Sequence, residues 1–233
     1  MDRTMSGEPS TVAPSGKARE LAALLLPPPS LDELQLLRRV QTYTMVGVPR
    51  LRALYRLGKR AIALGVPGAF VECGTCNGGS GAVLAHVAAR DRRPVWLFDS
   101  FEGLPEPAPE DGASAAGWKG QCLGQEAMVE QVLNRVDART DDVHIVKGWF
   151  EDTLAAAPTG PIAVLHLDGD WYESTRQILT TLYDRVDPRG YLLVDDYGHW
   201  PGCRRAVDEF FKERGQQPQI MRSDYTGVWF KKP

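Results

Sequence analysis

The stretch IAVLHLDGDWYEST, residues 162–175, leads from a short apolar run into two aspartates. A second stretch, YLLVDD at residues 191–196, ends in the same way, in a pair of adjacent aspartates. Each apolar run is rich in leucine or β-branched residues and bounded by Pro or Gly, which predicts a buried strand. Ligands bind at the carboxyl ends of strands in open α/β sheets, and acids there are costly without a positive group between them. The two stretches therefore predict an α/β fold with a site for a hard divalent cation such as Mg²⁺.

Helix capping is the alternative explanation for these aspartates. An aspartate that follows a strand often caps the next helix, and one carboxylate is enough for a cap. The pairs Asp168 and Asp170, and Asp195 and Asp196, each supply one carboxylate more. The extra carboxylate of each pair favours the cation site.

Length and composition are those of an ordinary globular protein. The chain has 233 residues, of which 43% are hydrophobic, enough for one sizeable α/β domain or two small ones. A net charge of −3 leaves no electrostatic footprint for nucleic acid or an anionic membrane. No apolar stretch approaches the ~20 residues that span a bilayer, and no secretory signal is evident. Four cysteines do not make a disulfide scaffold, so a cytoplasmic location is expected.

Three parts of the chain differ in pattern. Residues 1–17 are rich in Ser, Pro, Gly and Thr and predict a disordered leader. Residues 18–66 predict helices that precede the sheet and form a cap or an oligomerisation surface. Residues 67–233 contain the strands and predict the main domain.

The middle part predicts three helices. One covers residues 18–26, the second begins after Ser30 in a capping box with Glu33, and the third runs from Pro49 to near Gly65. In the second helix, Leu34, Leu37 and Val40 are expected on the buried face.

From residue 69 onward the chain alternates between strand and helix patterns. Strands are expected at residues 69–73, 94–99, 143–147, 162–167 and 191–194, and helices at 80–89, 126–136 and 174–186. This alternation predicts a doubly wound, mostly parallel sheet. Residues 219–222 and 228–231 flank a turn and predict a C-terminal antiparallel hairpin.

The loop after the first strand, ECGTCNGGSG at residues 72–81, indicates a cofactor site. It lacks the G-x-G-x-x-G fingerprint of dinucleotide sites and the Gly-Lys-Ser/Thr ending of phosphate loops. Glu72 suits a cationic group, and S-adenosylmethionine carries an ammonium and a sulfonium. Asp99, at the end of the next strand, is placed to accept hydrogen bonds from two ribose hydroxyls. The pair predicts S-adenosylmethionine, with a generic turn and a solvent-facing acid as the alternative.

Two cysteines in this loop, Cys73 and Cys76, have the spacing of a redox dithiol. A zinc site would need a second close pair, but Cys122 and Cys203 are isolated. Core packing of Cys73 and an incidental position for Cys76 are therefore favoured.

Five motifs occur together and in order. They are ECG with GGS in residues 72–80, FDSFEGLP at 98–105, KGWFEDTL at 147–154, HLDGD at 166–170 and VDDY at 194–197. As a set they resemble the macrocin O-methyltransferase (TylF-type) family, whose members methylate sugar or aromatic hydroxyls of secondary metabolites. The resemblance runs from about Thr44 to Lys231. It implies a class I, Rossmann-like methyltransferase fold for residues 67–233, with S-adenosylmethionine and Mg²⁺ as cofactors.

The resemblance also implies roles for particular residues. Asp168, Asp195 and Asp196 match the metal ligands, and Asp170 matches the proposed base, for which an Asx-type turn brace is the alternative. Cofactor contacts are expected from Glu72, Gly74, Thr75, Ser80, Asp99, Ser100, Trp149 and Asp168.

Two positions depart from the family pattern. The family usually has Trp-Arg where this chain has Cys76-Asn77, which affects the methionine end of the cofactor site. It usually has a smaller apolar residue at Trp171, which suggests an altered acceptor pocket. The long segment from Leu104 to Gly124 contains Trp118 and is expected to be either a lid over the acceptor or a surface insert.

The predicted function is metal-dependent methyl transfer from S-adenosylmethionine to a sugar hydroxyl of a natural product. A phenolic acceptor is the main alternative; an NAD(P)-type oxidoreductase and an inactive binding protein are the others. The expected partners are a small-molecule acceptor and a second copy of the chain, in a homodimer or higher symmetric oligomer built through residues 30–65.

Overall fold

The computed structural model describes residues 28–233, and within it Asp32–Pro233 form one compact unit. The predicted leader and the predicted helix at 18–26 lie outside the described residues.

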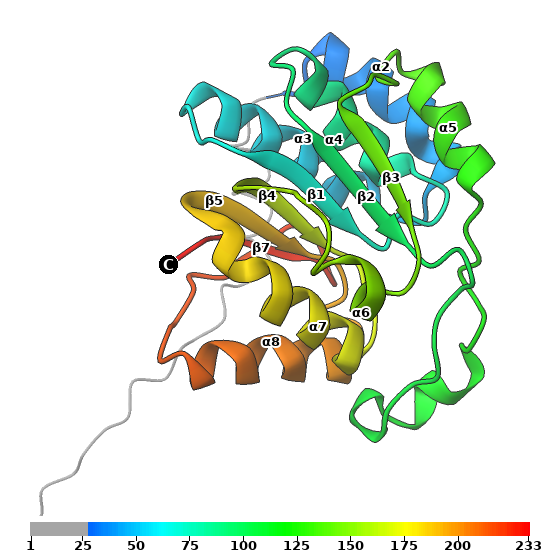
Figure 1. Cartoon of the computed structure of the whole chain (residues 1–233), viewed down its shortest axis with the longest axis vertical. Coiled ribbons are helices and arrows are strands. Elements are labelled where there is room, and N and C mark those ends of the chain that lie inside the picture. The colour runs from blue at the N-terminus through cyan, green and yellow to red at the C-terminus, as the bar shows by residue number, and fades with distance from the viewer. Residues whose placement is uncertain (1–27) are drawn as a thin grey trace, which may run out of the picture. The chain divides into compact units, whose positions relative to one another are not determined.

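A seven-stranded sheet in the order β3-β2-β1-β4-β5-β7-β6 forms the centre of this unit (Figure 1). The strands are β1 (Ala69–Cys73), β2 (Val95–Asp99), β3 (Val143–Lys147), β4 (Ile162–Leu167), β5 (Val186–Val194), β6 (Met221–Arg222) and β7 (Val228–Lys231). The first five are parallel, whereas β7 pairs antiparallel with both β5 and β6. The predicted mostly parallel α/β sheet with an antiparallel C-terminal hairpin is confirmed.

Strand β5 begins earlier than the sequence predicted. The expected start was Tyr191, but Val186 already pairs with Ile162 of β4, and the register shifts between Ile162 and Val164. The intervening Asp187-Pro188-Arg189-Gly190 has the composition of a turn, which hid the start of the strand.

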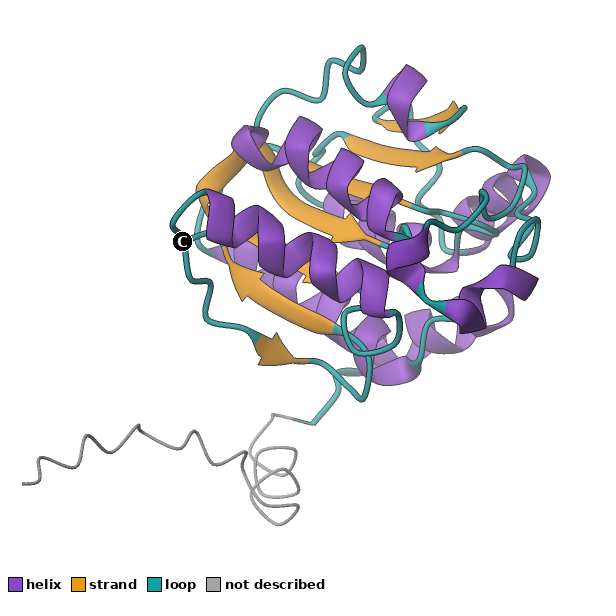
Figure 2. Ribbon diagram, turned by 90° about the horizontal axis from the view of Figure 1, so that it is seen from below, coloured by secondary structure: helices purple, strands orange, loops and turns teal. Residues whose placement is uncertain are grey.

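Helices cover both faces of the sheet. One face carries α2 (Leu31–Val40), α3 (Val48–Ala63), α4 (Gly79–Ala89) and α5 (Glu126–Arg135); the other carries α6 (Phe150–Thr153), α7 (Tyr172–Leu182) and α8 (Pro201–Glu213) (Figure 1). Figure 2 shows α7 and α8 side by side across their face of the sheet. Short 3₁₀ helices lie at Gln41–Tyr43, Pro109–Asp111, Ala113–Gly117 and Tyr183–Arg185. None of the helices within residues 28–233 is long and apolar enough to span a membrane.

Two buried clusters, one on each face, hold the layers together. The first joins α2 and α3 to α4, α5 and the sheet through residues such as Leu36, Leu54 and Leu84. The second joins the sheet to α7 and α8 through residues such as Leu179 and Phe210. Helices α2 and α3 therefore belong to the same hydrophobic core as the sheet. The division at residue 66 and the oligomerisation role of residues 18–66 stay predictions.

The buried face of α2 differs from the predicted one. Leu37 and Val40 are buried, but Leu34 is exposed and Glu33 occupies the inward position. Arg52 of α3 donates a hydrogen bond of 2.8 Å to Glu33 Oε1. A carboxylate with such a partner can occupy a buried position, which a pattern of apolar residues alone does not reveal.

Helix α8 was not predicted, although its signal is present in the sequence. Pro201 stands in its first turn, where its missing N–H has no cost. Cys203, Ala206, Val207, Phe210 and Phe211 then repeat at three- and four-residue spacing and are buried.

Candidate active site

A cavity of about 760 Å³ opens at the carboxyl ends of the parallel strands. Its walls come from the segments that follow β1, β2, β3, β4 and β5, together with residues 43–46 and the β6–β7 turn. Because all five strands are parallel, their carboxyl ends meet at one edge of the sheet. The topology therefore brings together residues that lie more than 120 positions apart in the chain, such as Gly74 and Asp196.

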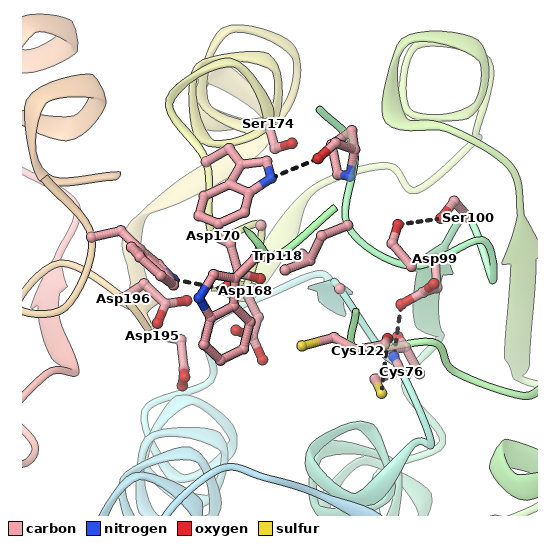
Figure 3. Close-up of a pocket in the computed structure, with 18 of the residues that line it drawn as sticks. Cys76, Asp99, Ser100, Trp118, Cys122, Asp168, Asp170, Ser174, Asp195 and Asp196 are labelled. Carbon is pink, nitrogen blue, oxygen red and sulfur yellow. Dashed lines mark hydrogen bonds between the residues drawn. The ribbon is translucent and has the colours of Figure 1, made fainter. Parts of the chain in front are cut away.

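Aspartates from β4 and β5 line one part of this cavity (Figure 3). Oxygen atoms of Asp168, Asp170 and Asp196 all lie within 4.8 Å of one another. Asp168 also belongs to a second group of this kind, with His166 and Asp195. The predicted ligands Asp168, Asp195 and Asp196 thus meet at one edge of the sheet but divide between two groups that share Asp168.

Contacts with Arg50 and His166 account for the separation of Asp195 from the group formed by Asp168, Asp170 and Asp196. Arg50 of α3 donates hydrogen bonds to Asp195 Oδ2 and, at 3.2 Å, to its backbone carbonyl. Its Nε donates to Asp224 in the β6–β7 turn at 2.8 Å. His166 Nε2 lies 3.4 Å from Asp195 Oδ1. Arg50 is buried and lines the cavity, and the sequence reasoning missed it because it lies in a helix that precedes the sheet.

Glu72 is the one predicted cofactor residue that does not line the cavity. Its side chain is fully buried, and its Oε1 lies 2.9 Å from His166 Nδ1. Burial alone would lower the pKa of His166, but the hydrogen bonds and negative charges of Asp195 and Glu72 raise it to about 9. His166 is therefore a buried, hydrogen-bonded histidine inside a strand.

Three aspartates of the cavity, Asp168, Asp170 and Asp196, have a raised pKa. Burial, reinforced by neighbouring carboxylates, raises the pKa of Asp168 and of Asp196. Burial raises the pKa of Asp170 to about 7, although Trp200 Nε1 donates a 3.0 Å hydrogen bond to its Oδ1. Such a cluster favours a bound cation, and a carboxyl group with a pKa near neutrality is suited to proton transfer.

The other part of the cavity is built around Asp99 at the end of β2. Its Oδ2 accepts a 2.7 Å hydrogen bond from the backbone N–H of Cys76, and its Oδ1 accepts one of 2.7 Å from Phe101. Burial raises the pKa of Asp99, and the backbone hydrogen bonds oppose this. Gly74, Thr75, Ser80, Ser100 and Trp149, all predicted cofactor contacts, line the cavity with it. The Thr75 hydroxyl is buried without a hydrogen-bond partner in the described residues, so a ligand is free to engage it.

Gly74 brings the two parts into contact. Its φ of +97° is in the region that favours glycine, and a Cβ there would lie 1.8 Å from the backbone oxygen of Asp168. The N–H of Asp168 in turn donates to the carbonyl of Cys73 at 2.9 Å. The glycine loop and the acid cluster are therefore adjacent, which suits a reaction between two bound molecules.

A family model described as Macrocin-O-methyltransferase (TylF) matches residues 37–232. The chain belongs to the TylF family. The predicted resemblance is thereby confirmed over nearly all of the residues that the structure describes.

Several methyltransferases are similar to this chain. Demethyldecarbamoylnovobiocin O-methyltransferase of Streptomyces niveus is 37% identical over 203 residues, covering 82% of this chain and 76% of that protein. Mycinamicin III 3''-O-methyltransferase of Micromonospora griseorubida is 34% identical over 201 residues, covering 82% and 78%. The solved structure of the O-methyltransferase NovP superposes with a TM-score of 0.76 at 33% identity and covers 82% of each chain. A calicheamicin methyltransferase, at 18% identity and a TM-score of 0.68 over 99% of each chain, shares the fold.

Proposed function

We propose that this chain transfers a methyl group from S-adenosylmethionine to a hydroxyl of a sugar carried by a natural product, with Mg²⁺ at the acid cluster. The proposal rests on one observation. In this TylF-family protein, a single cavity is lined both by the glycine loop with Asp99 and by four further aspartates, Asp168, Asp170, Asp195 and Asp196. Among the relatives, one from Streptomyces olivaceus, 37% identical over 197 residues, is named as a 4'-O-methyltransferase of a rhamnosyl tetracenomycin. A sugar acceptor is accordingly preferred to a phenol.

The residues of the cavity fit S-adenosylmethionine. Asp99 presents two carboxylate oxygens, each with a lone pair left after its backbone hydrogen bond, to the ribose hydroxyls. The unpartnered hydroxyl of Thr75 and the close approach permitted by Gly74 suit the methionine end, and Trp149 suits the adenine. Glu72 does not line the cavity; it contacts His166, and, beyond the effect of burial, its negative charge contributes to the raised pKa of Asp99 and of Asp168.

The acid cluster fits Mg²⁺. Carboxylate oxygens are the ligands that this cation prefers, and oxygens of Asp168, Asp170 and Asp196 already lie within 4.8 Å of one another. Asp168, Asp195 and Asp196 would hold the ion; Asp195, which the structure groups with Asp168 and His166, would be oriented by Arg50 and His166.

Asp170 is the proposed base. When bound, S-adenosylmethionine supplies the methyl group and Mg²⁺ lowers the pKa of an acceptor hydroxyl. Trp200 holds Asp170 through Oδ1, which leaves Oδ2 as the atom that takes the hydroxyl proton. A pKa near 7 allows this carboxylate to accept a proton at neutral pH and release it after the transfer.

The test is transfer of labelled methyl from S-adenosylmethionine to p-nitrophenyl α-L-rhamnoside, to the acceptors of the relatives named above, and to catechol. Glycoside methylation that EDTA abolishes and Mg²⁺ restores is expected. Asp170→Asn should retain S-adenosylhomocysteine binding in calorimetry while turnover falls by about 10²- to 10⁴-fold. Full activity in EDTA would exclude the metal role, and wild-type turnover of Asp170→Asn would exclude the base. Binding of a nicotinamide dinucleotide in place of S-adenosylhomocysteine would exclude methyl transfer altogether.

A further inference from the structure

Three indole rings form an aromatic wall beside Asp170. Trp118, Trp171 and Trp200 all line the cavity. The ring centroids of Trp118 and Trp200 lie 5.6 Å apart at 78°, and those of Trp171 and Trp200 lie 4.8 Å apart at 67°. Both are edge-to-face contacts, the arrangement that aromatic rings prefer.

The three rings have different exposures and hydrogen-bonding roles. Trp171 and Trp200 are buried, and their N–H groups are engaged, with the Pro105 carbonyl at 3.0 Å and with Asp170 at 3.0 Å. Trp118 is 41% exposed, and its N–H has no partner in residues 28–233. Trp118, which Figure 3 labels among the residues of the cavity, is therefore the ring with free surface; Trp200 packs against it and Trp171 packs against Trp200.

The segment that carries Trp118 is held in place rather than free. Leu104 accepts a 2.8 Å hydrogen bond from Gly120 and donates one of 2.9 Å to the Gln121 carbonyl, which closes the loop on itself. Asp111, fully buried within it, accepts a 2.7 Å hydrogen bond from the first residue of α7, Tyr172. The indole of Trp118 is thus preorganised next to Trp200 and the proposed base.

Polar groups of α7 that line the same cavity suit a ligand with several hydroxyls. Glu173, Ser174 and Gln177 of α7 line the same cavity and offer carboxylate, hydroxyl and amide groups. A sugar ring combines hydroxyls at its edge with an apolar C–H face, whose hydrogens carry partial positive charge and pack against the electron-rich face of an indole. A simple phenol offers a single hydroxyl and would engage fewer of these groups than a sugar.

On the basis of the proposed function, we propose that Trp118 is the specificity-determining residue of the acceptor site. The C–H face of the acceptor sugar packs on the Trp118 indole, while the hydroxyl to be methylated points to Asp170 Oδ2. Trp118 contacts the acceptor and takes no part in cofactor binding.

The experiment compares Trp118→Ala and Trp118→Phe with Leu123→Ala, a control that removes an exposed apolar side chain near the same segment but outside the cavity. The KM for p-nitrophenyl α-L-rhamnoside should rise about tenfold in Trp118→Ala, with kcat little changed and partial recovery in Trp118→Phe. Catechol kinetics and S-adenosylhomocysteine binding should not change.

Saturation-transfer NMR with methyl α-L-rhamnoside supplies a readout that needs no turnover. The ring C–H signals should be saturated in the wild type and in Leu123→Ala, and lost in Trp118→Ala. An unchanged KM and unchanged saturation in Trp118→Ala, with active wild-type enzyme, would overturn the role of Trp118 and leave the proposed function standing. A wild-type enzyme that methylates catechol but none of the glycosides would overturn the sugar acceptor itself.

Discussion

Arg50 places a guanidinium among the acids of the cavity. Its side chain and those of its partners Asp195 and Asp224 are nearly inaccessible to solvent. Arginine suits this position because its planar fork donates to both carboxylates at once. Removal of the charge would leave the buried carboxylate of Asp224 without this counter-ion and would leave Asp195 with His166 alone.

We expect Arg50→Met to lower the free energy of unfolding by about 3–5 kcal/mol, as measured by denaturant titration. Arg50→Lys should recover part of this loss, since an ammonium keeps the charge but not the fork. The matched control is Lys119→Met, which removes one partner of the exposed Lys119–Glu106 ion pair and should cost less than about 1 kcal/mol. If Arg50→Met and Lys119→Met lowered the free energy of unfolding equally, the buried ion pairs would contribute no more stability than the exposed one.

The ionisation of Cys76 and Cys122 bears on the alternative redox role of the Cys73–Cys76 pair. Burial, and then the negative charges of Asp99 and Asp170 respectively, raises the pKa of each thiol to about 11. A raised pKa keeps a thiol protonated, and therefore unreactive, at neutral pH.

Alkylation of these thiols by iodoacetamide should be slow at pH 8, and its rate should rise about tenfold per pH unit up to pH 10. The rate is measured by mass spectrometry, and circular dichroism checks that the protein stays folded at each pH. An unperturbed thiol, such as N-acetylcysteine, levels off above a pH of about 9. A plateau for Cys76 below pH 9 would contradict the raised pKa and would favour a redox role for the Cys73–Cys76 pair.

At the scale of elements, Asp111 joins the long loop after β2 to the helix after β4. Its Oδ1 accepts from the N–H of Tyr172 in the first turn of α7, and its Oδ2 accepts from Ala108 at 2.8 Å. It thereby supplies the helix cap that the residue at the N-cap, Trp171, does not. The carboxylate also stands at the positive end of the α7 dipole.

Asp111→Ala should lower the free energy of unfolding by about 1–2 kcal/mol through the lost cap. Because the same loop carries Trp118, the KM for a glycoside should rise as well, while S-adenosylhomocysteine affinity should not change. Ser114→Ala, an exposed position in the same loop, is the control and should match the wild type in both measurements. Wild-type stability of Asp111→Ala would rule out its capping role.

At the scale of the whole molecule, the N-terminal helices leave apolar side chains exposed. Leu34 of α2, Val48 of α3 and Met45 between them are exposed even though their helices are packed on the core. We retain the prediction that part of residues 30–65 forms the interface of a homodimer or higher symmetric oligomer.

Light scattering after size exclusion should report at least twice the chain mass of 25.7 kDa at micromolar concentration. Leu34→Glu should shift the protein towards the monomer, whereas Gln35→Glu, which adds the same charge at the adjacent exposed position, should not. A monomeric wild type, with and without S-adenosylhomocysteine, would exclude the interface.

The sequence by itself determined the order of the parallel strands along the chain and the edge at which the site lies. Short apolar runs that end in acids or glycine are local signals, and parallel topology brings their ends together wherever the strands lie in the chain. These signals predict aspartates at one edge of the sheet, and there Asp99, Asp168, Asp170, Asp195 and Asp196 line one cavity. The same local signals missed α8, whose apolar repeat was overlooked, and the start of β5, which has the composition of a turn.

Only the tertiary structure decided what each acid contacts. Asp195 is paired with Arg50, 145 residues earlier, and Glu72 with His166, 94 residues later. Which side chain neutralises a buried charge depends on the packing of distant elements, and no periodicity in the sequence encodes that packing. For this reason Glu72 lies beneath the cavity rather than in it, and Arg50 lines the site although its helix precedes the sheet.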